Sequence, residues 1–218
     1  MRTKILLLLS AVLVIAAILM DFLLIPSRTG SVAMQYNPVF YLHIPVAWIA
    51  LGGFLIVFVA GIAYLKTRRI FWDIVGSTAA ELGLLFTTLF LLTGSIWGKA
   101  EWGTWWTWEA RLTSSLVLWI IYVGYLLLRA YITGPEQKAR FAAVFGIIGF
   151  LDVPIVILTL FVSRSMHPGN EDFKPDVPTL VTGVIAFSLL FSVLMLLRIR
   201  LKENEHELSK LKELQGEE

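Results

Sequence analysis

The sequence contains no cysteine and few charged residues. Without thiol groups, the chain cannot form a disulfide bond, a thiolate metal site, an iron–sulfur cluster or a cysteine nucleophile. Charged residues make up 16% of the 218 positions and hydrophobic residues 57%, whereas a soluble domain carries about 25% charged residues. Ten of the 34 charged residues (18 basic and 16 acidic) lie in the last twenty positions. The remainder is too apolar for a water-soluble surface, which excludes an ordinary soluble enzyme, a nucleic-acid binder with a basic patch and a disordered chain.

Six apolar segments are long enough to cross a membrane as helices, which takes about 20 mostly apolar residues. The first follows two basic residues but lacks the small-residue cleavage site of a secretory signal, so we expect it to be retained. No strand-length alternation is present, which disfavours a barrel. We therefore predict an all-α integral membrane protein with a six-transmembrane-helix bundle over residues 1–198 and a charged tail over 199–218. The predicted spans are Ile5–Ile25, His43–Leu65, Ile74–Ile96, Leu112–Leu128, Phe141–Val162 and Thr179–Leu197.

Lysine and arginine are distributed unevenly over the predicted loops. Thirteen fall on the side of the two termini and five on the opposite side. Because cytoplasmic loops carry the excess of basic residues, we predict that both termini are cytoplasmic. The loops 26–42, 97–111 and 163–178 then share the outer face.

Tryptophan is concentrated in one of these outer loops. One interpretation is an aromatic belt at the membrane interface, where tryptophan is enriched. A belt spreads over many helix ends, however, whereas the opposite surface has essentially Trp72 alone. If residues 101–110 are helical, Trp102, Trp105, Trp106 and Glu109 share one face. Such a helix lies in the interface plane, and its aromatic face either enters lipid or forms a wall for a large flat ligand. Five of the eight tryptophans lie in this loop, namely Trp97, Trp102, Trp105, Trp106 and Trp108.

The chain has three histidines, and two of them lie at the outer ends of spans. His206 lies in the charged tail and is most simply a solvated residue. His43 and His167 lie on the same predicted face as the tryptophans. Imidazole is a common haem ligand, and two imidazoles on opposite faces of a porphyrin complete the coordination of its iron. We therefore predict one haem at the outer face, with Met166 as an alternative to His167.

The tryptophan loop carries a recognisable signature. Residues 102–113 read WGTWWTWEARLT, which resembles the "WWD" signature of haem-handling proteins in cytochrome c biogenesis, and residues 93–99, TGSIWGK, are similar too. Six spans with one outer histidine on each side of the signature are similar to the haem exporter protein C (CcmC) family of the bacterial cytochrome c maturation system. The resemblance covers the chain except its charged tail. One position departs from the pattern, because the acid after the last tryptophan is usually Asp and is Glu109 here.

The resemblance implies a haem-handling and delivery protein of the bacterial inner membrane, not an enzyme. It implies haem b at the periplasmic face, with His43 and His167 as the axial ligands of the iron. The implied partners are a membrane-anchored periplasmic haem chaperone, the ATPase and membrane subunits of an ABC transporter, and a small membrane subunit. Arg111 and Lys99 are the nearest candidates to bind the haem propionates. The other implied cofactor-binding residues are Trp97, Trp102, Trp105, Trp106, Trp108 and Glu109.

Two acids inside the predicted spans need a separate explanation. Placing Glu81 or Asp152 in lipid costs about 2.5–3.5 kcal/mol each, so both are expected to face the bundle interior. They would serve a proton-coupled or small-solute transporter, but interhelical hydrogen bonds beside small residues explain them more simply. Two further alternatives are a structural subunit anchored by its tryptophans and the haem-handling subunit of the other cytochrome c assembly route, whose members are usually longer.

Overall fold

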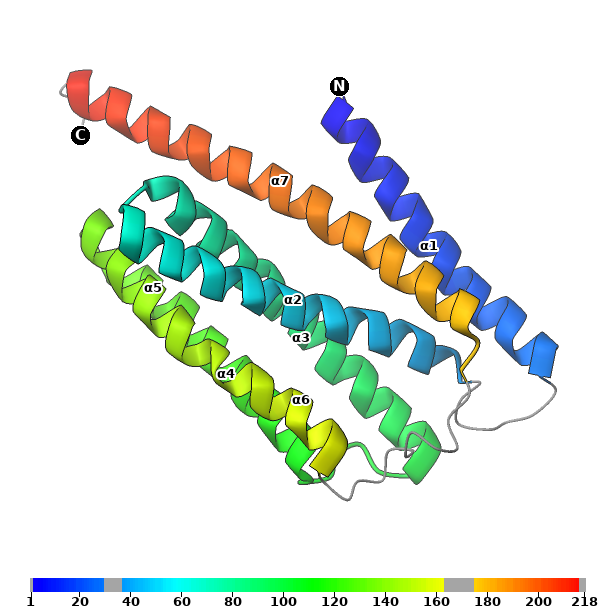
Figure 1. Cartoon of the computed structure of the whole chain (residues 1–218). Helices are drawn as coiled ribbons and strands as arrows, with labels where there is room; N and C mark the ends of the chain where they lie inside the picture. The colour runs from blue at the N-terminus through cyan, green and yellow to red at the C-terminus, as the bar shows by residue number, and fades with distance from the viewer. Residues whose placement is uncertain (1, 30–36, 163–174, 216–218) are drawn as a thin grey trace.

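The computed structural model describes residues 2–29, 37–162 and 175–215, and within these ranges the chain forms α-helices and no strand (Figure 1). Five helical segments are long and apolar enough to cross a membrane, and α1 contains a shorter apolar stretch, Ile5–Leu19. The prediction of a multi-pass membrane protein with about six packed helices is confirmed. The helices are α1 (Arg2–Thr29), α2 (Pro38–Thr67), α3 (Ile70–Trp102), α4 (Ala110–Tyr131), α5 (Pro135–Phe150), α6 (Asp152–Val162) and α7 (Val177–Gln215).

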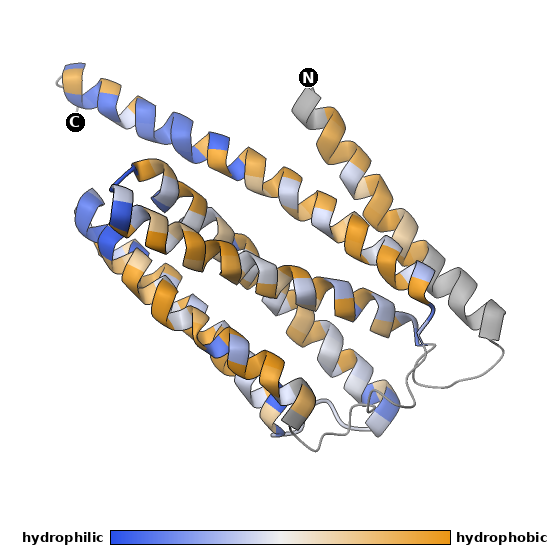
Figure 2. Ribbon diagram, in the orientation of Figure 1, coloured by the Kyte–Doolittle hydropathy of each residue, from blue (hydrophilic) through white to orange (hydrophobic). Residues whose placement is uncertain are grey.

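Two helices differ in extent from the predicted spans. The fifth span is divided into α5 and α6 at Leu151, although Pro135–Thr159 still forms one apolar helical segment. The sixth predicted span and the charged tail up to Gln215 lie in one helix, because α7 runs through both over 39 residues, about 58 Å. In Figure 2 the colour of α7 changes from mainly hydrophobic to mainly hydrophilic toward the C-terminus, and the ribbon is continuous.

The helix α2 lies at the centre of the bundle, where it packs against α1, α3, α5 and α7. Close approach to α3 depends on Gly83, because a Cβ atom there would lie 2.8 Å from the ring of Phe54. Phe54 in turn stacks on Tyr122 of α4, with ring centroids 3.7 Å apart. The predicted span that begins at His43 therefore lies inside the bundle and not at its periphery.

One end of the bundle, here called the tryptophan end, gathers the starts of α2, α4 and α7 and the ends of α3 and α6 (Figure 1). Asn37 caps α2 there, since its side chain accepts a hydrogen bond from the backbone N–H of Val39 at 3.0 Å. The helix α3 ends where Gly103 takes the left-handed conformation (φ 72°) and donates its N–H to the carbonyl of Lys99. Residues 103–109 are not helical, so the conditional interface helix over 101–110 does not form.

The two acids of the predicted spans have different environments. Glu81 accepts a hydrogen bond from Arg198 Nε and forms an ion pair with Lys202 Nζ, both at 2.8 Å and both from α7. This confirms the predicted interhelical hydrogen bond for Glu81. For Asp152, at the start of α6, the predicted bond stays a prediction, because the buried Oδ2 atom has no hydrogen-bond partner among the described residues. Asp73 and Arg129 form a further pair between α3 and α4 (2.9 Å) that the sequence did not predict.

Candidate functional site

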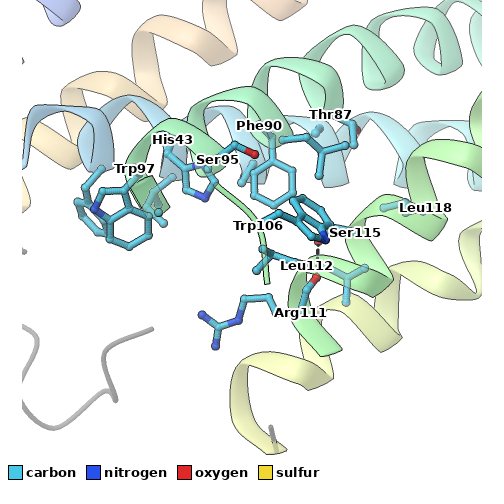
Figure 3. Close-up of a pocket in the computed structure, with 18 of the residues that line it drawn as sticks. His43, Thr87, Phe90, Ser95, Trp97, Trp106, Arg111, Leu112, Ser115 and Leu118 are labelled. Carbon is cyan, nitrogen blue, oxygen red and sulfur yellow. Dashed lines mark hydrogen bonds between the residues drawn. The ribbon is translucent and has the colours of Figure 1, made fainter. Parts of the chain in front are cut away.

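A partly open cavity of about 290 Å³ lies at the tryptophan end of the bundle. Its walls come from α2, α3, the connection 103–109, α4 and α6, with Leu180 of α7. The volume is close to the lower end of the range for small-molecule sites, about 300–1,000 Å³. Six predicted site residues line it: His43, Trp97, Trp102, Trp105, Trp106 and Arg111. Figure 3 labels four of them, His43, Trp97, Trp106 and Arg111.

His43 enters the cavity from the second turn of α2 and is only 6% exposed. Its Nδ1 atom lies 3.1 Å from the hydroxyl oxygen of Thr93 on α3. The imidazole lies between aromatic side chains of α3, with ring centroids 4.7 Å from Phe90 and 5.7 Å from Trp97. A histidine ring held in this way is pre-positioned, because it loses little further rotational freedom when a ligand binds.

The five clustered tryptophans divide into a wall and an exposed pair. Trp97 is 2% exposed and packs against Trp102, with ring centroids 5.3 Å apart. Trp106 also faces the cavity, and its buried Nε1 atom has no hydrogen-bond partner among the described residues. Trp105 is 58% exposed at the cavity edge, whereas Trp108 is 77% exposed and is absent from the cavity lining in the described part of the chain.

Arg111 lies in the first turn of α4 and supplies the cationic group of the cavity. Its buried Nε atom has no hydrogen-bond partner among the described residues. In Figure 3 its guanidinium points away from Thr87 and Leu118, which lie deeper in the bundle. Lys99, the other predicted propionate partner, instead donates to the carbonyl of Gly103 at 2.7 Å.

Two predicted site residues are not brought to the cavity wall. Glu109 precedes α4 and, like Trp108, is not part of the lining that the structure describes. His167 and its alternative Met166 lie outside the described residues. The ends of the segment that contains them, at α6 and α7, lie at the tryptophan end.

Sequence reasoning gave no role to Thr93, which it named only within the family signature, and it missed Phe90. These two residues hold the His43 ring. A signal for them is present, because Phe90, Thr93, Gly94 and Trp97 are spaced i, i+3, i+4 and i+7 and so share one face of a helix. That spacing marks a face but does not say which residue of another helix it contacts.

Comparison with known proteins identifies the family of this chain. A family described as "Heme exporter protein C" matches residues 2–213. The chain belongs to this family, as the signature predicted.

Several relatives carry the same name. The protein of Bradyrhizobium diazoefficiens is 34% identical over 74% of this chain and 65% of its own length. The protein of Rhodobacter capsulatus is 32% identical over 80% of this chain and 76% of its own length. The Escherichia coli K12 protein is 32% identical over 74% of this chain and 68% of its own length. The chain thus spans about two thirds to three quarters of the length of these relatives.

Proposed function

We propose that this protein binds haem b in the cavity at the tryptophan end and presents it for cytochrome c maturation. The observation that carries the proposal is the buried imidazole of His43 in a tryptophan-walled cavity that also contains the Arg111 guanidinium. The names of the relatives support the same function.

The chemistry of the cavity fits haem. Arg111 Nε and Trp106 Nε1 are buried donors without an acceptor among the described residues, and an unpaired buried donor costs about 1–3 kcal/mol. A ligand with carboxylates offsets this cost, since a carboxylate accepts charge-assisted hydrogen bonds from a guanidinium. Haem combines propionate carboxylates with a flat apolar ring, which matches these donors and the aromatic wall.

Each residue group has a distinct role in the proposed mechanism. When bound, haem supplies the iron and the vinyl groups that cytochrome c maturation uses, whereas the protein supplies position and access. His43 and His167 would hold the iron through their imidazole nitrogens. The tryptophan wall excludes water from one part of the macrocycle, and Arg111 holds a propionate. The chain itself then performs no covalent step.

The proposed orientation follows from the charges at the bundle ends, and the proposed partners follow from the family. Both termini are cytoplasmic and the tryptophan end faces the periplasm, in accordance with the excess of basic residues at the other end. The proposed recipient is a membrane-anchored haem chaperone. The proposed complex contains the ATPase and membrane subunits of an ABC transporter and a small membrane subunit.

Because the chain has no cysteine, single-cysteine variants test the orientation without background labelling. Ala100 is exposed at the tryptophan end and Lys210 is exposed near the C-terminus of α7. An impermeant maleimide added to spheroplasts should label Ala100→Cys before lysis and Lys210→Cys only after lysis. The opposite pattern would overturn the orientation.

The alternative of a transporter built around Glu81 and Asp152 has less support. Glu81 is ion-paired to α7, and neither acid lines the cavity among the described residues. No second function is proposed from them.

The experiment that tests haem binding uses detergent-purified protein and a pyridine haemochrome assay. The double variant His43→Ala/His167→Ala should lose the haem spectrum, whereas His206→Ala, which removes the remaining histidine, should retain it. A wild-type haem spectrum in the double variant would show that neither histidine is needed for binding and would refute the proposed ligands. The single variants His167→Ala and Met166→Ala then identify the second ligand.

A further inference from the structure

One face of α3 forms a seat for the His43 ring. Phe90, Thr93, Gly94 and Trp97 all contact or approach the imidazole from successive turns. Two of these residues do more than fill space, because Thr93 offers a hydrogen bond and Gly94 leaves room for the ring.

The hydrogen bonds of Thr93 determine which way its contact with His43 runs. The Thr93 hydroxyl donates to the backbone carbonyl of Leu89 at 2.8 Å. Its oxygen also lies 3.1 Å from the backbone carbonyl oxygen of Phe90. A hydroxyl has one proton and two acceptor lone pairs. Since the proton is engaged by the α3 backbone, the hydroxyl accepts from His43, and the Nδ1 atom of His43 is the donor. Neutral imidazole carries one N–H, so Nε2 then holds the lone pair.

Gly94 allows the ring to lie directly on the α3 backbone. A Cβ atom at this position would be 2.9 Å from His43 Cε1 and 3.4 Å from Nδ1. Any larger residue would therefore push the ring away from Thr93.

We propose that Thr93 is a positioning residue for His43, which it holds as the Nδ1–H tautomer so that Nε2 can bind a metal, with Gly94 providing the space. Metal-ligating histidines commonly donate their second ring N–H to a protein acceptor, which sets both tautomer and ring orientation. The inference about the tautomer rests on geometry alone, whereas its consequence for iron rests on the proposed haem function.

The tautomer is measurable in the haem-free protein. Because the chain has only three histidines, solid-state NMR of ¹⁵N-histidine-labelled protein in lipid resolves protonated from unprotonated ring nitrogens, with His43→Ala to assign the signals. At a pH where free imidazole is neutral, we expect the proton on Nδ1 in the wild type and in Thr93→Ser. Thr93→Val should give a mixture of tautomers. A wild-type Nε2–H tautomer, or an unchanged spectrum in Thr93→Val, would overturn the proposal.

A matched control is available on the same helix. Thr88 also donates to a carbonyl one turn back (Leu84, 2.9 Å) and accepts an N–H, that of Trp119 at 2.9 Å, but it is not a partner of His43. Thr88→Val removes the same kind of bond and should leave the His43 signals unchanged. A change equal to that of Thr93→Val would assign the effect to general loosening of α3 and overturn the specific role.

Haem titration separates failure of this inference from failure of the proposed function. Loss of a residue that orients a metal ligand typically weakens affinity about 10–100-fold, and we expect this for Thr93→Val but not for Thr93→Ser or Thr88→Val. If the wild type binds no haem, the proposed function fails while the tautomer measurement still decides the role of Thr93. If haem binds through His43 with equal affinity in Thr93→Val, the positioning role fails alone.

Discussion

Asn37 and Glu101 join the start of α2 to the end of α3, with the Asn37 side-chain nitrogen donating to Glu101 Oε1 at 2.8 Å. The Asn37 side chain also caps α2 through its oxygen, which accepts from the N–H of Val39. One amide therefore links the ends of the two helices that carry His43 and its seat. Because both bonds come from one side chain, conservative substitutions can separate them.

Asn37→Asp should keep the cap and lose the bond to Glu101, since a carboxylate cannot donate and repels its neighbour. We expect the free energy of unfolding to fall by about 0.5–1.5 kcal/mol, the usual contribution of one hydrogen bond. Thermal melts of the detergent-purified protein measure this change. The additional change Glu101→Gln should restore stability by removing the repulsion, and a double variant no more stable than Asn37→Asp would contradict this interpretation.

Arg111→Leu should weaken haem binding about tenfold or more, because hydrogen bonds to charged groups contribute about 1.5–3 kcal/mol. The haem-free protein should be no less stable, since the substitution removes a buried Nε donor that has no acceptor among the described residues. Absorbance titration measures affinity and thermal melting measures stability. Lys99→Leu is the control. Lys99 donates to the Gly103 carbonyl, so this variant should leave haem affinity unchanged. Lower haem-free stability in Arg111→Leu would instead indicate an internal partner.

Gly94→Ala should destabilise the protein by about 1–3 kcal/mol, the usual cost of forcing an extra group into a packed site. The added methyl group meets the His43 ring at 2.9 Å, so haem affinity should fall as well. Gly52→Ala on α2 is the matched control, because nothing lies within 4 Å of a Cβ atom there. It should be neutral or slightly stabilising, as alanine is the better helix former. Equal effects in the two variants would refute the steric argument.

Glu81→Gln should lower the melting temperature while haem binding persists. The substitution removes the charge that Arg198 and Lys202 of α7 neutralise, and it lies outside the cavity lining. Melting curves and the haemochrome assay together test this, with Glu213→Gln on the exposed end of α7 as the control. If assembled Glu81→Gln protein lost activity, the transporter interpretation would regain support.

A membrane bundle of about six helices and the family were predictable from the sequence. Hydropathy adds up over about 20 residues, so errors at single positions do not change the count. The tryptophan signature and its flanking histidines lie in short linear segments, and for this reason the family was recognisable before any contact was known.

The contacts of the site were not predictable in the same way. Gly103 ends α3 and separates Trp102 from Trp105 and Trp106, so the tryptophans do not share a helical face. Whether Trp106 or Trp108 faces the cavity depends on the path of the irregular connection 103–109 and not on spacing.

The amino-acid sequence alone determined that His43 lies near a helix start, on the same predicted face as a tryptophan-rich loop. Only the tertiary structure decided that Thr93, fifty positions later, holds its ring, and that Glu81 pairs with α7. The physical reason is that the apolar pattern of a nearly uniform membrane helix leaves its rotation about its own axis undetermined. Packing against neighbouring helices sets that rotation, and with it the partner of each polar side chain.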